Sequence, residues 1–412
     1  MDGEEESKFN LGEDSSKKMK LCDGIDGALM DILIYEVFTR LSIKQLYRLK
    51  TLCHKFNDSI PHDPAFVAAY RSRRRSSNSS HCSNSSLYLC RSRRVISNAE
   101  NNDSEFTHLE LGFGKNVVRV KGATNGFLYG YCLHPLELFV CNPITKQFSC
   151  VPNPIRKKEP RSLALAVDPY DPSSGFSLIA LNSLLVSNFF QFMVYSSKRG
   201  KWKSSEAQVL VPSQDFLRVN GNVYTKGKVY WSLARYIVWY DVEEDEAGIF
   251  NCPHNKDLVL LRPSNEVMYS EISVYNGDLS YSKMTKEGNI QIWLWKNKKK
   301  EAWKMRHGDK ETWKMRHNVR LHEIVKENWD VMSQICKNLR MKNRETVVEA
   351  FARGRTLYPL PYVGGKVVWF WIKVKCIGKL FSIDLKTGGL KLIDDVELPV
   401  WPFTPTPLPF PT

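Results

Sequence analysis

The sequence predicts two folds in one chain: a small all-α unit near the N-terminus, followed by an all-β domain built like a propeller. Between residues 28 and 70, apolar side chains recur every three or four positions, which is the period of a helix. After residue 105 the pattern changes to short apolar runs rich in Val, Ile, Tyr, Phe and Trp, separated by Gly, Pro, Asn and Asp. The chain has 412 residues, 42% hydrophobic and 25% charged, which is a globular composition.

The N-terminus is acidic and polar over residues 1–22, and we expect it to be disordered. It has the features of neither a signal peptide nor a transit peptide. No apolar run approaches the length of a membrane helix, so we expect no membrane partner. The ten cysteines are scattered, as is usual for reduced thiols inside the cell. The expected location is therefore the cytoplasm, the nucleus or both.

A helical unit is predicted over residues 23–70. A first apolar stripe is formed by Met30, Leu33, Val37 and Leu41, and Ser42 is suited to cap the start of a second helix. The stripe of that second helix consists of Leu46, Leu49, Leu52, Cys53, Phe56 and Ile60. Asp63-Pro64 interrupts the pattern. A unit of this size cannot bury much core by itself, which suggests that it completes its burial against a partner.

Residues 71–105 are rich in Arg and Ser and are predicted to form a basic linker. Residues 71–94 of this stretch and residues 296–320 carry almost all of the net charge of +15, and the rest of the chain is close to neutral. A dedicated nucleic-acid binder should present a basic face on a folded unit, so nucleic acid is an unlikely partner. The basic runs also suit nuclear-import signals or solvated linker charge.

A repeat runs through residues 106–405. Five glycines each open a strand after a turn: Gly126, Gly175, Gly227, Gly277 and Gly365. The first four are spaced at about fifty residues, with a second apolar run in every unit, which is typical of propeller blades. The last gap is almost twice as long and leaves room for two units, so the blade number stays open. The alternative is a β-sandwich with evenly spaced turns.

Residues 301–320 contain a tandem duplication, EAWKMRHGDK followed by ETWKMRHNVR. Two Trp–Arg sets could stack on bases or bind an acidic partner. The favoured interpretation is an insertion that lengthens one loop between strands.

Residues 29–66 resemble an F-box of the form found in large plant families. The match is carried by Leu29, Leu33-Ile34, Glu36-Val37, Arg40-Leu41, Lys44, Leu46, Arg48-Leu49-Lys50, Leu52-Cys53, Phe56, Ile60, Asp63-Pro64 and Phe66. Three positions depart from the pattern, because Met30 and Ser42 replace prolines and Phe56 replaces tryptophan. Met30 cannot reproduce the fixed backbone angle of proline, which predicts weakened adaptor binding.

The resemblance implies that this unit docks a Skp-type adaptor and, through it, a cullin-RING ubiquitin ligase. The adaptor contacts implied by the resemblance are Leu29, Met30, Leu33, Ile34, Val37 and Leu41, with Leu46, Leu49 and Leu52 shared between core and interface. The alternative is that all nine form only the core of a helical subdomain.

The β-domain also resembles the F-box-associated, kelch-like region of those families, through Asn125-Gly-Phe-Leu-Tyr and the run from Val140 to Phe148. The resemblance implies that this region captures a protein target for ubiquitination; the target itself is unknown.

No catalytic motif is present. Cys132, Cys141 and Cys150 are nine residues apart, which is not a zinc spacing, and there is no phosphate loop, Gly-x-Ser-x-Gly or His-Glu-x-x-His. We therefore expect a non-catalytic substrate receptor without a cofactor. The main alternative is a basic propeller that contacts nucleic acid or an acidic partner through residues 296–320. A propeller enzyme is the weakest alternative, since no acidic or histidine cluster is evident.

Overall fold

The computed structural model divides the chain into two compact units, which are described separately below. The first consists of residues 1–82 with 405–409, and the second of residues 83–404 with 410–412. The residues described are 27–41, 45–46, 49, 63–77, 87–90, 95–97, 118–132, 136–154, 160, 162–168, 175–184, 189–211, 219, 221–233, 235–253, 270–285, 287–295, 313–333, 357–362, 365–374, 377–395 and 400–402. The predicted disorder of residues 1–22 and most of the predicted second helix lie outside them.

The first unit contains a helical run made of α2 (Gly27–Ile32), η2 (Leu33–Val37) and η3 (Phe38–Arg40), which we call the N-terminal helix. The middle part, η2, is a π-helical turn, which is wider than an α-helical turn. This turn changes which side chains share a face. The predicted stripe of Met30, Leu33, Val37 and Leu41 is therefore wrong, because Met30 is buried whereas Val37 is exposed.

The second helix of this unit, α5 (Pro64–Ser77), begins at the predicted break. Asp63 caps it, since its Oδ1 atom accepts hydrogen bonds from the amides of Ala65 (2.8 Å) and Phe66 (3.4 Å). Pro64 suits the first helical position, where no amide hydrogen is needed. Asp63-Pro64 thus marks a helix start.

The predicted linker over residues 71–105 contains regular structure. The helix α5 continues to Ser77, since Arg is a good helix former. Strands β1 (Leu87–Cys90) and β2 (Val95–Ser97) also lie in this stretch and pair antiparallel. The third strand of this sheet is β23 (Val400–Pro402), which pairs with β1 although more than three hundred residues separate the two strands. A partner at the other end of the chain is invisible to a local pattern.

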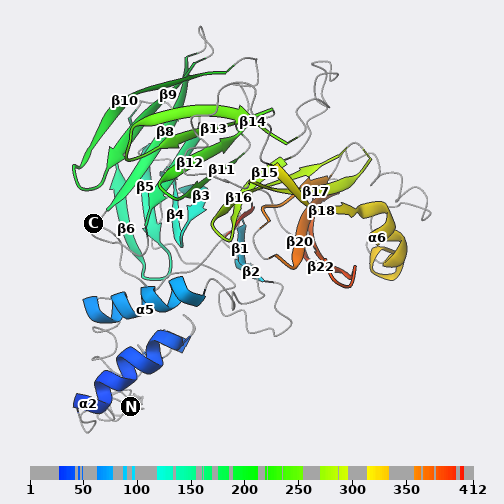
Figure 1. Cartoon of the computed structure of the whole chain (residues 1–412), viewed down its shortest axis with the longest axis horizontal. Helices are drawn as coiled ribbons and strands as arrows, with labels where there is room; N and C mark the ends of the chain where they lie inside the picture. The colour runs from blue at the N-terminus through cyan, green and yellow to red at the C-terminus, as the bar shows by residue number, and fades with distance from the viewer. Residues whose placement is uncertain are drawn as a thin grey trace, which may run out of the picture. The chain divides into compact units, whose positions relative to one another are not determined.

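The second unit contains five antiparallel sheets of four strands, each formed by consecutive strands (Figure 1). The first two blades are β3 (Val118–Thr124), β4 (Phe127–Cys132), β5 (Glu137–Asn142) and β6 (Gln147–Val151), then β7 (Ser162–Val167), β8 (Phe176–Leu184), β9 (Phe189–Ser196) and β10 (Lys201–Leu210). The third is β11 (Gly221–Thr225), β12 (Lys228–Ser232), β13 (Tyr236–Asp241) and β14 (Glu246–Asn251). The last two are β15 (Ser270–Tyr275), β16 (Asp278–Met284), β17 (Asn289–Trp295) and β18 (Trp313–Arg320), then β19 (Leu357–Pro359), β20 (Val367–Val374), β21 (Ile377–Asp384) and β22 (Leu390–Asp395). The predicted propeller is confirmed.

The repeating glycines occupy the turn between the first two strands of each blade. All five have positive φ, from 70° at Gly175 to 89° at Gly126. In three blades the preceding residue is also left-handed: Asn125, Lys226 and Asn276, each with φ of 51°. Two such residues in succession form the type I′ turn that matches the twist of a hairpin. Glycine therefore recurs along the sequence because the first turn of each blade needs a residue with positive φ, which glycine adopts most easily.

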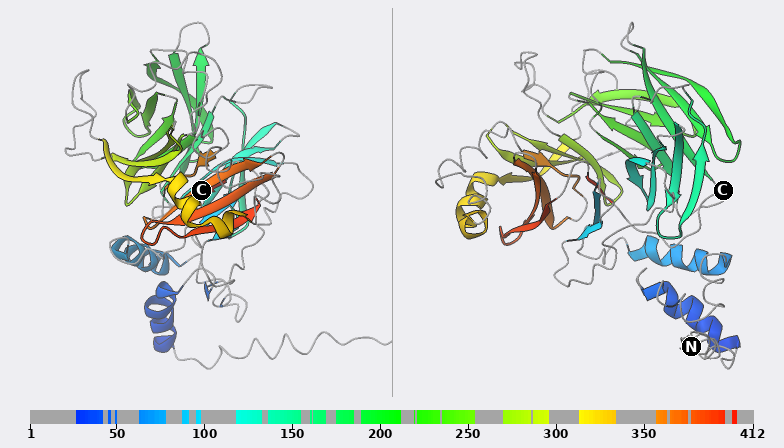
Figure 2. Two further views of the ribbon diagram at one scale, coloured as in Figure 1. Left: turned by 90° about the vertical axis from the view of Figure 1, so that its right-hand side faces the viewer. Right: turned by 180° about the vertical axis from the view of Figure 1, so that it is seen from behind.

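In the described residues of the long gap between Gly277 and Gly365, no additional blade is formed. These residues belong to the later strands of the fourth blade, to the helix α6 (Leu321–Glu327) and to the start of the fifth blade. Figure 2 shows α6 beside the fifth blade. There, Asn328 donates from Nδ2 to the carbonyl of Gly388 (3.1 Å) and accepts from the amide of Leu390 (3.0 Å).

The turn between the last two strands is closed in the same way in three blades. The side chains of Asn142, Asp241 and Asp384 each accept two hydrogen bonds from backbone amides two and three residues later, at 2.8–3.3 Å. Asx turns of this kind stabilise tight connections. The first of these turns lies in the run from Val140 to Phe148 that carried the resemblance of the β-domain, at Asn142-Pro-Ile-Thr-Lys146.

Apolar cores fill the spaces between successive blades. The largest fully buried side chains include Trp231, Trp369, Tyr129 and Tyr240. The residues on β16–β18, α6 and β19–β22 form one such core between the fourth and fifth blades. A sixth, three-stranded sheet of β2, β1 and β23 joins both ends of the domain, with β23 beside β3. Among the helices described, none is long and apolar enough to cross a membrane.

Candidate functional site

The N-terminal helix buries one face in the first unit's own core. Met30, Ile34 and Phe38, spaced by four residues, are 4–7% exposed. They pack with Leu46, Phe66, Val67 and Tyr70, so that side chains of α5 close the same cluster. A helical pair of this size thus forms a small core.

Outside this buried face, the N-terminal helix exposes large apolar side chains. Leu29 is 51% exposed, Ile32 55% and Val37 41%, and Leu33 between them is half-buried. We call these four residues the apolar row. Single exposed apolar residues are common, but three exposed and one half-buried on one short helix of a small unit mark a surface suited to a partner. The row is the candidate docking site.

Burial divides the nine residues to which the resemblance assigned adaptor contacts. Leu29 and Val37 are exposed, whereas Leu33, Leu41 and Leu49 are half-buried. The buried members are Met30, Ile34 and Leu46, which belong to the unit's own core. Leu52 lies outside the described residues. Ile32 was not predicted; its position three residues after Leu29 was the available signal, obscured by the π-helical turn that follows.

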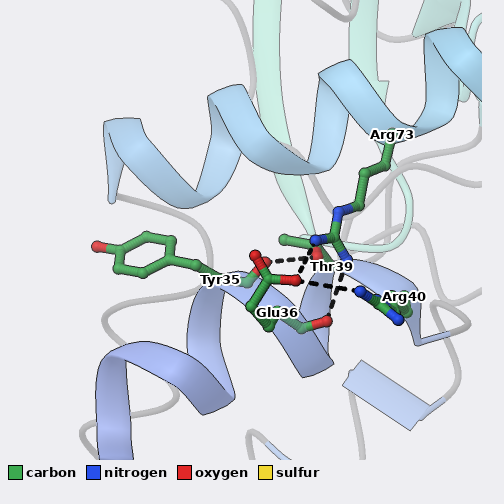
Figure 3. A network of polar contacts seen from close by, with 5 residues as sticks. All are labelled: Tyr35, Glu36, Thr39, Arg40 and Arg73. Carbon is green, nitrogen blue, oxygen red and sulfur yellow. Dashed lines mark hydrogen bonds and ion pairs between the residues drawn. The ribbon is translucent and has the colours of Figure 1, made fainter. Parts of the chain in front are cut away.

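A polar clamp joins the N-terminal helix to α5 (Figure 3). Arg73 donates from Nη2 to the Glu36 carboxylate (2.5 Å) and from Nη1 to the Glu36 carbonyl (3.0 Å). Arg40 donates to the same carboxylate (3.1 Å). The hydrogen bond from Arg73 and its charge hold the pKa of Glu36 below its usual value. The clamp fixes the helix beside Val37 of the apolar row.

A second polar contact lies on the same two helices. The Tyr35 hydroxyl donates to Asp63 Oδ2 at 2.6 Å, and the Thr39 hydroxyl donates to the Tyr35 carbonyl at 2.8 Å. The hydrogen bond to Asp63, with burial, raises the pKa of Tyr35 to about 12. Asp63 therefore caps α5 with one oxygen and holds the N-terminal helix with the other.

The second copy of the WKMRH duplication is strand β18, the outermost strand of the fourth blade. The interpretation of the duplication as loop is therefore wrong for this copy, whereas the first copy lies outside the described residues. Trp313 is 9% exposed, and its indole Nε1 donates to the Asn251 carbonyl of the third blade (3.1 Å). Its ring also contacts Trp295 at a centroid distance of 5.1 Å. A ring held in this core has no free face for stacking on a base.

The Arg and His of this copy contact aromatic residues. Arg316 lies over the ring of Tyr275 at 5.0 Å, and His317 Nε2 is 3.2 Å from the Tyr362 hydroxyl. Tyr362 in turn donates to the carbonyl of Gly365 (2.8 Å). Burial lowers the pKa of His317. The Arg316 contact lies within the fourth blade, and the His317 contact joins β18 to Tyr362, which lies between the first two strands of the fifth blade.

The cysteines form no ligand set in the described part of the chain, where no group of three or more His, Cys, Asp or Glu side chains is placed to hold a metal. Cys132 and Cys141 are buried in the first blade, and burial raises the pKa of both thiols.

The fold and the site define a class: a β-propeller protein preceded by a small helical unit with an exposed apolar row. Residues 107–329 match the family model described as "F-box protein At3g26010-like, beta-propeller". The match covers more than half of the chain, and the chain belongs to this family.

One protein with a similar sequence and two solved structures are also reported for comparison with the chain. The F-box protein At5g49610 of Arabidopsis thaliana is 24% identical over 251 residues, which are 54% of this chain and 64% of that protein. The chain thus spans less than two thirds of this relative's length. Among solved structures, a chain of the nidogen/laminin complex is 9% identical with a TM-score of 0.37, covering 78% of this chain and 98% of that chain. The SapL1 lectin in complex with α-methyl fucoside is 11% identical with a TM-score of 0.36, covering 76% and 90%.

Proposed function

We propose that this protein is a substrate receptor of a Skp–cullin–F-box ubiquitin ligase. The helical unit docks the Skp-type adaptor, and the propeller recruits a protein target. The protein performs no covalent step itself; it raises the local concentration of target near the enzyme that carries ubiquitin. The cytoplasm and the nucleus are both suitable places for this role.

The observation that carries the proposal is the division of the N-terminal helix into two apolar faces. Met30, Ile34 and Phe38 lie in the unit's own core, and Leu33 packs partly against it, whereas Leu29, Ile32 and Val37 of the apolar row are exposed. A helix with a second apolar face is suited to a groove on a partner, where side chains at helical spacing act as anchors. Membership of an F-box protein family supports an adaptor as that partner.

The buried part of the predicted set has a supporting role in this proposal. Met30, which stands where the F-box pattern has proline, is 5% exposed in the unit's core. We infer that Met30, Ile34 and Leu46 position the row, and that Leu29, Ile32, Leu33 and Val37 make the contacts.

The test is capture of the full chain by a purified Skp-type adaptor, comparing the parent with Leu29→Asp/Val37→Asp. The matched control is Leu210→Asp, because Leu210 is 53% exposed on the propeller, close to the 51% of Leu29. We expect capture of the parent and of the control, and loss of capture in the double variant. Capture that is equal for all three chains, or absent for a folded parent, would refute the proposal.

The alternative hypothesis, that the propeller binds nucleic acid, was based on residues 296–320 and their WKMRH duplication. No observation on the described part of residues 296–320 favours it, since Trp313 is held in the core and Arg320 pairs with Glu323 at 2.9 Å. An affinity for RNA or DNA that falls steeply with salt would revive it.

A further inference from the structure

A carboxylate on an inner strand of the propeller has no partner. The first strands of successive blades contact one another, from β3 through β7, β11 and β15 to β19, so they form the inner edge of the blades. The strand β15 carries Glu271, whose side chain is half-buried. Among the described residues, none forms a hydrogen bond or an ion pair with the Glu271 carboxylate. A polar group left in this way on the inner edge needs an explanation.

Two neighbours define the surroundings of this carboxylate. Gly221 on β11 has no side chain, and a Cβ there would lie 3.0 Å from Glu271 Oε2, so the carboxylate lies against the backbone of the third blade. Ser282 on β16 is directly paired with Glu271, and directly paired side chains share one face of a sheet. The Ser282 hydroxyl is buried and has no hydrogen-bond partner in the described part of the chain. Two unpartnered polar groups therefore occupy paired positions on β15 and β16.

The strands that pack closely on β15 offer the carboxylate no cation. These strands are β11, β12, β16 and β19, and their charged side chains are Lys228, Asp278 and Lys283. Lys228 is held in an ion pair within the third blade. Lys283 is paired across the ladder with the residue before Glu271, so its side chain leaves the sheet on the opposite face. A cation for Glu271 must therefore come from outside these strands.

We propose that Glu271 binds an ammonium group at the inner edge of the propeller, supplied by a lysine side chain of a target protein or by a free amine. A carboxylate shielded from water is costly, and a cation beside it offsets that cost. An ammonium group is a compact charge with three donors, whereas a hard divalent metal needs several oxygen ligands. In the described residues no group of three acidic, Cys or His side chains is placed to hold a metal. The inference rests on the proposed function only where the lysine belongs to a recruited target.

The titration of Glu271 supports this site and gives it a second readout. Burial alone raises the pKa of the carboxyl to about 8. A bound ammonium group favours the ionised carboxyl, so binding below this pH releases a proton and the affinity rises with pH. Tyr281 is the neighbouring titratable group on β16, and burial raises its pKa well above the usual value. Tyr281 thus stays protonated over the range in which Glu271 ionises.

The test is isothermal titration of the full chain with propylammonium, which reproduces the end of a lysine side chain, at constant ionic strength. Propanol is the uncharged control ligand. The matched control variant is Glu246→Gln, because Glu246 is an exposed glutamate on the outer strand β14. We expect saturable propylammonium binding by the parent and by this control, and at least about tenfold weaker binding by Glu271→Gln. Equal affinity in Glu271→Gln, or no saturable binding by a folded parent, would overturn the proposal.

The same titration at several pH values separates the site from a general attraction of charges. We expect the affinity of the parent to rise by up to about tenfold per pH unit between about pH 6 and 8, and an affinity independent of pH would overturn the proposal. Nα-acetyl-lysine N-methylamide then distinguishes the sources of the ammonium group. Binding at least as tight as that of propylammonium assigns it to a protein lysine, and weaker binding assigns it to a free amine. Adaptor capture is measured separately, so its failure refutes the proposed function and leaves this test standing.

Discussion

The indole of Trp239 on β13 occupies the space that a side chain at Gly248 on β14 would need. The two residues are paired across the strands, and a Cβ at position 248 would lie 2.7 Å from the ring. Real contacts of that kind are essentially never this short. The absence of a side chain at Gly248 therefore lets the ring lie across its neighbour, where the ammonium group of Lys228 approaches the ring at 4.6 Å.

We expect Gly248→Ala to destabilise the propeller by about 1–3 kcal/mol, the usual cost of overpacking. The φ of Gly248 is not left-handed, so the cost comes from space and not from the backbone. Denaturant unfolding of the parent and the variant measures it. In a Trp239→Ala background the same change should cost little. An equal loss in both backgrounds would show that the ring is not the obstacle.

The Trp313 indole joins the third and fourth blades, which leads to a second prediction. Trp313→Phe removes the hydrogen bond to the Asn251 carbonyl and leaves space in the core, so we expect a loss of about 2 kcal/mol in the free energy of unfolding. Met315→Ala on the same strand is the control, since Met315 is 45% exposed and should change stability little. If both variants unfold alike, Trp313 is not an anchor of the blade.

Tyr35 and Asp63 give a prediction in alkaline solution. The pKa of Tyr35 is raised to about 12 in the folded unit, whereas an unfolded tyrosine titrates near 10. A raised pKa stabilises the protonated form, so this contribution is complete below pH 10 and is lost as the pH rises towards 12. Far-ultraviolet circular dichroism of the parent should fall more steeply over this window than that of Tyr35→Phe. Tyr35→Phe itself should cost about 1 kcal/mol near neutral pH.

Glu36 gives the opposite dependence on pH. Its pKa is lowered by Arg73 and Arg40, so the contribution of its carboxylate is present above the ordinary glutamate pKa and disappears as the pH falls through the lowered value. We expect protection of the N-terminal helix against hydrogen exchange, corrected for intrinsic rates, to decrease in this acidic range. Glu36→Gln should show weaker protection at neutral pH and no such step in acid. A step of the same size in Glu36→Gln would assign it to another group.

Much of the propeller could be predicted from the sequence because its signals are local. A left-handed turn favours glycine, so Gly126, Gly227 and Gly277 mark successive hairpins, and Asn142 marks the turn that it caps. The exposed face of the N-terminal helix was harder to predict from the sequence. The π-helical turn at Leu33–Val37 changes the period of the helix, and the assignment of inner and outer faces from a regular period fails there. The pairing of β1 with β23 joins the beginning and the end of the second unit, and no spacing within either segment indicates it.

That pairing provides the last prediction. Leu89 on β1 pairs with Trp401 on β23, and β23 lies beside β3 of the first blade, so the C-terminal strand links the small sheet to the propeller. Deletion of residues 400–412 removes the partner of β1 and leaves β1 and β2 as a two-stranded hairpin, which is marginally stable at best. We expect a lower Tm for the propeller in this variant, measured by near-ultraviolet circular dichroism. Deletion of residues 403–412 alone keeps β23 and serves as the control. If the two deletions lower the Tm equally, the effect belongs to the final ten residues and the strand is not what holds the two ends together.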